Sequence, residues 1–151
     1  MPSDDIYLGN PNLKKANTPV EFTADQISEF IKCKKNPVYF AKKYVQIVNL
    51  DEGLVPFAPY KFQEKLIKRF HRERFNICKM PRQTGKSTTV VAYLLHYAVF
   101  NDSVNIGILA NKAATARELL GRLQTAYENL PKWMQQGIIA WNKGSMELEN
   151  G

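Results

Sequence analysis

Apolar positions in the second half of the chain change between strand-like and helical spacing. The run "VNIGILA" (104–110) is almost continuously apolar, as in a strand covered on both faces, and the short mixed segment "FNICKM" (75–80) predicts another strand. Residues 87–100 are apolar after their first turn and predict a buried helix, and residues 116–127 carry apolar positions at helical spacing until Pro131. The order strand, loop, helix, strand, helix predicts an α/β fold with a parallel sheet and right-handed crossovers.

The first part of the chain predicts a short, mainly helical segment ahead of this sheet. Residues 1–20 show no periodicity and are interpreted as an extended arm. Thr23 followed by Gln26 has the spacing of a capping box. A helix is therefore predicted from this point to about Lys34, ahead of an Asn-Pro pair that disfavours helical backbone.

A second amphipathic helix is predicted to begin near Pro59, because proline suits the first turn of a helix. Phe62, Leu66 and Phe70 follow at i, i+4 and i+8 and give this helix one apolar face. The other side carries five cations, which are Lys61, Lys65, Lys68, Arg69 and Arg72.

Composition narrows the class of protein. The 151 residues are 44% hydrophobic, enough for one domain with a core. The net charge of +7 and the pI near 9.4 favour polyanionic partners such as nucleic acid or nucleotides, although solvated lysine faces give the same values. The sequence contains no run of about 18 apolar residues, so it predicts no membrane-spanning helix. Cys33 and Cys78 stand in unrelated surroundings and are interpreted as reduced thiols of a cytosolic protein.

The segment "KMPRQTGKSTT" (79–89) lies between a predicted strand and the buried helix, where nucleotide-binding folds place a phosphate loop. This position directs backbone N–H groups and a helix N-terminus at a ligand and favours negative charge. Gly85 lets the backbone approach a phosphate, Lys86 would reach the terminal phosphates, and the Ser87 hydroxyl would ligate Mg²⁺. A basic turn between a strand and a helix is the alternative interpretation.

The loop departs from the usual G-x-x-x-x-G-K-[ST] pattern at its first position, where Met80 replaces glycine. The change is tolerable if Met80 turns the chain without a positive φ. Arg82 is either a surface arginine or a permanently charged, planar group that offsets transition-state charge beside the phosphates. The other candidate nucleotide contacts of the loop are Gln83, Thr84 and Thr88.

Phe62 and Gln63 lie upstream of the loop on the basic helix. A glutamine amide offers a donor and an acceptor that match the edge of adenine, and an adjacent aromatic ring packs on the base. A solvated glutamine is the ordinary interpretation of this pair. The pair becomes a candidate adenine site because the phosphate loop follows it.

A carboxylate pair at Asp51-Glu52 ends the apolar segment "VQIVNLDE" and resembles the metal-binding end of a catalytic strand. It precedes the phosphate loop, and Gly53 follows it directly, so we interpret residues 51–53 as a turn between short extended segments at 38–47 and 53–57. No other apolar run ends in a carboxylate. We therefore expect the catalytic acid to lie outside this sequence.

The last residues carry a hairpin signal. Met146 and Leu148 alternate with glutamates, and Asn150-Gly151 is a typical hairpin turn. A returning strand would lie past this turn, so we expect the chain to be a fragment of a longer protein. Residues 1–58 are expected to form an arm with a helical and hairpin lead-in, and residues 59–151 the first part of the α/β domain.

Taken together, these motifs resemble the large terminase subunit of T-even-like tailed bacteriophages. That family has an arginine ahead of Gln-x-Gly-Lys-[ST], which matches residues 82–87, and an aromatic residue followed by glutamine, which matches Phe62-Gln63. Its further motifs match in order at Ala110-Asn111-Lys112, Leu130-Pro131, Gly137-Ile138 and Trp141-Asn142-Lys143-Gly144-Ser145. The resemblance extends from about Gly9 to Gly151.

The resemblance implies a RecA-like P-loop ATPase core that binds ATP and Mg²⁺ and moves double-stranded DNA into a procapsid. Lys86 and Arg82 would be catalytic. The implied partners are the portal protein, the small terminase subunit and further copies in a ring, in the cytoplasm of an infected bacterium. The acidic Walker B strand, the coupling motif and the nuclease domain of the family would follow Gly151, so we expect little turnover from this chain alone.

Two alternatives stay open. A helicase-like translocase shares the glutamine and the phosphate loop, but helicases usually keep a small residue and a glycine where this chain has Met80-Pro81-Arg82. The other alternative is a non-catalytic basic module that binds nucleic acid or a partner and retains a vestigial loop.

Overall fold

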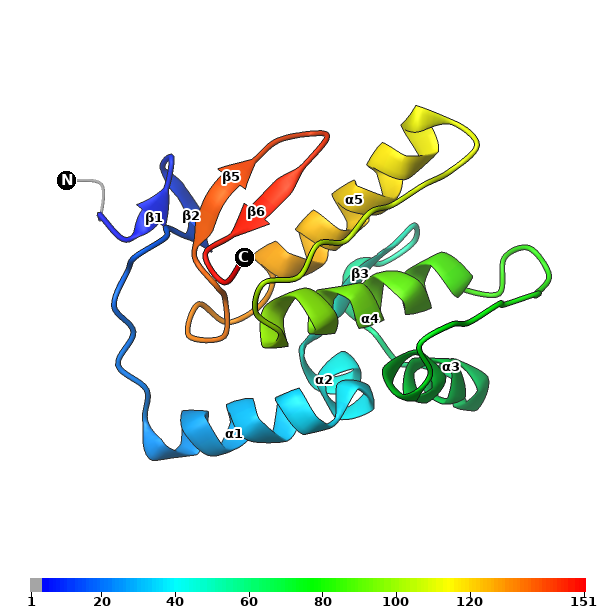
Figure 1. The fold of residues 1–151 in the computed structure, drawn as a ribbon, viewed down its shortest axis with the longest axis horizontal. Coiled ribbons are helices and arrows are strands. Elements are labelled where there is room, and N and C mark those ends of the chain that lie inside the picture. Colours follow the sequence, from blue (N-terminus) through cyan, green and yellow to red (C-terminus); the bar gives the residue numbers. More distant parts are fainter. Residues whose placement is uncertain (1–3) are drawn as a thin grey trace.

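The computed structural model describes residues 4–151, which form five helices and three two-stranded antiparallel sheets (Figure 1). The helices are α1 (Ala24–Lys35), α2 (Pro37–Tyr44), α3 (Lys61–Arg72), α4 (Lys86–Phe100) and α5 (Ala113–Glu128). The sheets pair β1 (Ile6–Tyr7) with β2 (Asn10–Lys14), β3 (Gln46–Asn49) with β4 (Gly53–Pro56), and β5 (Ile138–Trp141) with β6 (Met146–Leu148). The fold is therefore mixed α/β, as predicted.

Helix α4 lies at the centre of the molecule, with α5 on one side and α2 and α3 on the other (Figure 1). Leu95, Val99 and Phe100 of α4 are buried, and the Phe40 ring of α2 packs edge-on against Phe100 with centroids 5.3 Å apart. Burial of these large side chains supplies most of the favourable energy that holds the helices together. The predicted buried helix is confirmed, although the side of α4 that carries Val90 is exposed.

The predicted capping box is confirmed at the start of α1. The Thr23 hydroxyl accepts a hydrogen bond from the Gln26 N–H (3.2 Å), and the Gln26 amide oxygen accepts one from the Thr23 N–H (3.1 Å). The next segment corrects the prediction, because residues 37–44 form α2 and are not extended. Pro37 occupies the first helical position and the Asn36 side chain accepts the Tyr39 N–H (3.0 Å), so local capping favours a helix here.

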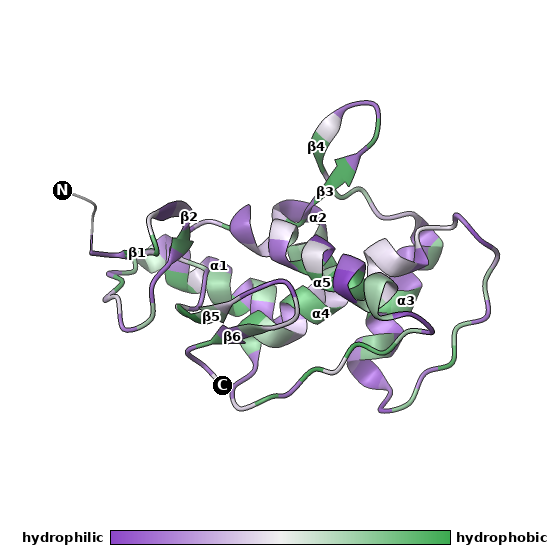
Figure 2. Cartoon of the chain, turned by 90° about the horizontal axis from the view of Figure 1, so that it is seen from above, coloured by the Kyte–Doolittle hydropathy of each residue, from purple (hydrophilic) through white to green (hydrophobic). Residues whose placement is uncertain are grey.

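The turn at residues 51–53 is confirmed. Strands β3 and β4 pair in register on either side of it, and Gly53 has the left-handed φ of 76° that the turn requires. Figure 2 shows this hairpin projecting from the helices. Asp51 and Glu52 are exposed at the tip of this hairpin and belong to no strand. In the sequence they precede the phosphate loop.

The predicted parallel sheet is not present among residues 4–151, whose three sheets are each two-stranded and antiparallel. Residues 75–80 and 104–110 are extended but pair with no strand among residues 4–151, and Phe75 and Leu109 are 82% and 91% exposed. A strand gains its hydrogen bonds only from a neighbouring strand, and the described chain offers none at either position. The second segment runs back along α4 towards the start of α5 (Figure 1).

The N-terminal arm is more structured than the sequence suggested, although residues 1–3 of the expected arm lie outside the described residues. Strands β1 and β2 pair, and Lys15 makes a parallel bridge to Ile138 of β5. The Glu149 carboxylate accepts the N–H groups of Asn17 and Gly137, both at 2.8 Å. These contacts between distant parts of the sequence fix the arm against the C-terminal hairpin.

The C-terminal hairpin also differs from the prediction. Strand β6 is the second strand of its hairpin, because it pairs with the preceding β5. The Asn150 amide then donates to the carbonyls of Ala98 (2.9 Å) and Asn101 (2.8 Å) at the end of α4.

Across the described residues, no helix has both the length and the apolar character needed to cross a bilayer.

Candidate functional site

The phosphate-loop candidate is a turn that leads directly into α4. Gly85 is the N-cap of α4 with φ 72° and ψ 25°, a left-handed conformation that favours glycine. The helix begins at Lys86, one residue earlier than predicted. Its first turn contains no acidic side chain. Because the first N–H groups of a helix have no intrahelical partner, this end presents unpaired donors and positive potential to an anion.

Gly85 is also confined by its neighbour on α3. A Cβ at position 85 would lie 2.6 Å from the Gln63 side-chain nitrogen, so a side chain there would require this amide to shift. Gln63 is only 4% exposed. Its amide nitrogen donates to the Gly85 carbonyl (3.3 Å) and its amide oxygen accepts the Tyr60 N–H (2.8 Å). Gln63 therefore links the start of α3 to the start of α4.

Thr89 completes this link and was missed by the sequence analysis. It is fully buried, and its N–H (3.0 Å) and hydroxyl (2.7 Å) both donate to the Gly85 carbonyl. The carbonyl thus accepts from three donors, two on α4 and one on α3. A buried threonine one turn into a helix was the available signal, because threonine often bonds back to the carbonyl four residues earlier.

The Lys86 ammonium lies inside the loop and donates to the Met80 carbonyl at 2.7 Å. The Thr84 hydroxyl donates to the Pro81 carbonyl at 3.0 Å, so both bonds draw the two ends of the loop together. Met80 is not among the residues with positive φ. The condition under which methionine can replace the first glycine is therefore met. Gln83 carries the positive φ of this loop instead, at 59°.

The remaining predicted contacts lie at the surface of the loop. Arg82, Gln83 and Ser87 are exposed, and Thr88 is half-buried. The structure thus brings together the loop residues and Gln63.

An aromatic pair stands beside this link at the N-terminus of α3. The Phe62 and Tyr60 rings are stacked, with centroids 5.9 Å apart and planes 9° from parallel, and they are 41% and 71% exposed. Tyr60 is a second residue that the sequence analysis missed. Its position just ahead of the aromatic–glutamine pair was the only signal. Together the rings offer an exposed apolar surface next to Gln63.

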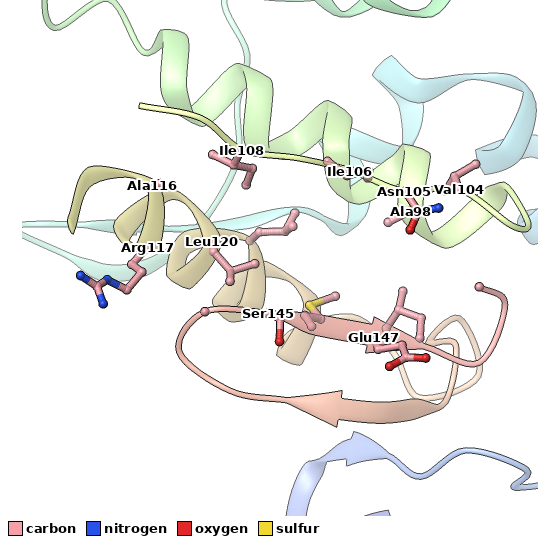
Figure 3. A pocket seen from close by; sticks show the side chains of 15 residues that line it. Ala98, Val104, Asn105, Ile106, Ile108, Ala116, Arg117, Leu120, Ser145 and Glu147 are labelled. Atoms are coloured by element: carbon pink, nitrogen blue, oxygen red, sulfur yellow. The ribbon is translucent and has the colours of Figure 1, made fainter. Parts of the chain in front are cut away.

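A hollow of about 300 Å³ lies elsewhere and contains none of the predicted site residues. It is bounded by the 104–108 segment, α5 and β6, and Figure 3 shows Ile106, Ile108 and Leu120 among its lining side chains. The lining is mainly aliphatic, so we interpret this hollow as a packing gap beside an unpaired extended segment. Within residues 4–151 no three His, Cys, Asp or Glu side chains gather as a metal site.

Residues 77–151 match a protein-family model described as "Terminase large subunit, T4likevirus-type, N-terminal". The matched range contains the loop, α4, α5 and the C-terminal hairpin. Phe62 and Gln63 lie ahead of it.

Proposed function

Since residues 77–151 belong to the N-terminal family of T4-like terminase large subunits, the chain is assigned to viral genome packaging, and we propose that its 80–88 loop binds ATP with Mg²⁺ to drive double-stranded DNA into a procapsid. The observation that carries the proposal is the geometry at Gly85. A left-handed glycine at the start of a 15-residue helix, with a lysine next to it and no acid in the first turn, suits a bound polyphosphate.

Each loop residue has a role in this proposal. The Lys86 ammonium exchanges the Met80 carbonyl for the terminal phosphates, and Ser87 provides the hydroxyl ligand for Mg²⁺. Gln83, Thr84 and Thr88 contribute N–H groups, and the exposed Arg82 offsets charge that develops during phosphoryl transfer. ATP supplies the phosphoryl group whose transfer to water releases the energy.

The base would lie on the Tyr60–Phe62 surface. These exposed rings provide an apolar face for adenine, and the Gln63 amide beside them would read its edge. This second role requires Gln63 to release one of its backbone partners, Tyr60 or Gly85. Nucleotide binding and the α3–α4 link would then compete for the same amide.

A RecA-like parallel sheet remains part of the proposal. The extended segments 75–80 and 104–110 flank α4, and the exposed Val90 of that helix lies on a face that a sheet would cover. With further strands as neighbours, both segments would pair as the sequence predicts. The partners that we propose are the portal protein, the small terminase subunit and further copies in a ring, in the cytoplasm of the infected host.

A nucleotide titration tests the proposal. We expect the chain to bind a fluorescent ATP analogue with Mg²⁺, with little turnover, because no apolar run in the sequence supplies a catalytic carboxylate. Lys86→Ala should weaken binding roughly ten- to a hundredfold, the effect of one lost charge-assisted contact. Lys79→Ala is the matched control, since Lys79 is exposed just before the loop. If the Lys86→Ala variant binds as tightly as the unmodified chain, a non-catalytic basic module is favoured instead.

A further inference from the structure

Helix α3 carries a row of cations on the side opposite its buried face. Lys61, Lys65, Lys68 and Arg72 follow at spacings of four, three and four residues, which places them within about 60° of one another around the helix. We call these four residues the basic stripe. All four are exposed, whereas Gln63 and Ile67 on the other side are buried.

The acidic residues near the stripe are already paired. Glu64 contacts Lys42 of α2 at 2.6 Å, and Glu73 contacts Arg72 at 2.6 Å. Among the ion pairs of residues 4–151, none includes Lys61, Lys65 or Lys68. Three neighbouring lysines thus hold a net positive charge on one rigid face, at a cost in mutual repulsion that an anionic partner would relieve.

The shape of the stripe favours a straight, rigid polyanion. Four cations stand about one turn apart along a helix of 12 residues, which is about 18 Å long. Duplex DNA presents phosphates at a dense, regular spacing along a stiff axis, so it can meet the three lysines of the stripe at once. A flexible acidic peptide would have to be ordered along the same line, at an entropic cost.

We propose that the basic stripe is the surface on which this chain holds the phosphate backbone of duplex DNA. The choice of DNA as the polyanion rests on the proposed packaging function. The same helix places Gln63 at the Gly85 carbonyl, so one rigid element connects the DNA surface to the nucleotide loop. The stripe therefore suits a site where nucleotide state changes the grip on DNA.

Salt-dependent binding tests this inference. Fluorescence anisotropy with a labelled 20-base-pair duplex would be measured across a series of salt concentrations for the 151-residue chain. The triple variant Lys61→Gln, Lys65→Gln, Lys68→Gln should lower the slope of log K against log salt by about 2–3 and weaken binding at least about tenfold. The control triple, Lys34→Gln, Lys132→Gln, Lys143→Gln, removes the same charge from exposed sites elsewhere and should keep the slope.

These outcomes distinguish DNA binding by the basic stripe from DNA binding through the overall positive charge of the chain. Equal losses in the two triple variants, or a loss in neither, would overturn the inference, and so would equal affinity for polyglutamate and duplex at matched charge. Replacing the three stripe lysines by arginine keeps the positive charge and should preserve the slope; loss there too counts against the stripe. The ATP-analogue titration on the same samples tests the proposed function separately, because the stripe lysines lie outside the loop.

Discussion

Two structural constraints of the site act on Gly85, one on its backbone conformation and one on the space around its Cα. Its φ of 72° suits glycine, and the space where a Cβ would lie is filled by the Gln63 amide. The carbonyl of the same residue accepts hydrogen bonds from the Gln63 amide of α3 and from the Thr89 hydroxyl of α4. The backbone at this position therefore serves both stability and the proposed approach of a phosphate.

We predict that Gly85→Ala destabilises the chain by about 1–2 kcal/mol, because a left-handed alanine is strained and the buried Gln63 must move. Urea unfolding measures the change. Gly121→Ala is the matched control: Gly121 lies inside α5, and a Cβ there would meet no atom within 4 Å. Alanine at that position should instead add up to about 1 kcal/mol of stability. A Gly85→Ala protein as stable as the unmodified chain would disprove the confinement.

At the scale of elements, local signals decide the helices and distant contacts decide the strands. The Thr23–Gln26 capping box allowed α1 to be predicted, because both of its hydrogen bonds join residues within one segment of four. The pairing of Lys15 with Ile138 joins residues more than a hundred positions apart. The periodicity of neither segment predicts this pairing. The segment 104–110 has the composition of a strand, yet composition cannot provide a neighbour.

One carboxylate of α1 accepts three hydrogen bonds from α2. Glu29 accepts from Lys43 (2.7 Å), the Tyr39 hydroxyl (2.8 Å) and the Tyr44 hydroxyl (3.0 Å). The Lys43 hydrogen bond is the largest cause that lowers the pKa of Glu29, to about 2. Since this pKa is depressed on folding, the contribution of Glu29 is complete above its ordinary pKa of 4.5 and is lost as the pH falls towards 2.

We predict that Glu29→Gln lowers the midpoint of thermal unfolding at pH 7 by roughly 5 °C, the shift expected when charge-assisted hydrogen bonds weaken in a chain of this size. The difference from the unmodified chain should shrink between pH 4.5 and 2, because Glu29 itself becomes protonated there. Glu21→Gln, at an exposed position, serves as the control and should change little. A difference that is constant across this pH range would contradict the role of the charge.

At the scale of the whole molecule, the sequence predicted the loop better than the framework around it. The turn into α4 was predicted from adjacent residues, whereas the left-handed φ of Gly85 was not. The Gln63 link spans 22 positions and emerges only once α3 and α4 pack. The roles of Arg82 and Ser87 and the division at residue 58 stay predictions. The sheet expected from 75–80 and 104–110 requires strands that the described chain does not place beside them.

His96 connects several elements of the core and makes the whole fold sensitive to acid. Its ring bonds the Cys33 carbonyl of α1 (2.9 Å) and packs against Phe40 of α2, His71 of α3 and Tyr93 of α4. The other ring nitrogen is buried without a hydrogen-bond partner. Burial is the main cause that lowers the pKa of His96 from 6.5 to about 4.

Because the unfolded chain takes up this proton near pH 6.5 and the folded chain only near pH 4, stability should fall as the pH drops between these values, by on the order of 3 kcal/mol. Below pH 4 this group should add no further dependence. Urea unfolding at pH 7, 5.5 and 4 measures the loss, and His96→Phe should remove most of it, since phenylalanine fills the same aromatic cluster without titrating. His71→Phe is the control for the exposed neighbour. If the His96→Phe protein loses stability over this pH range as steeply as the unmodified chain, the acid sensitivity arises from another group.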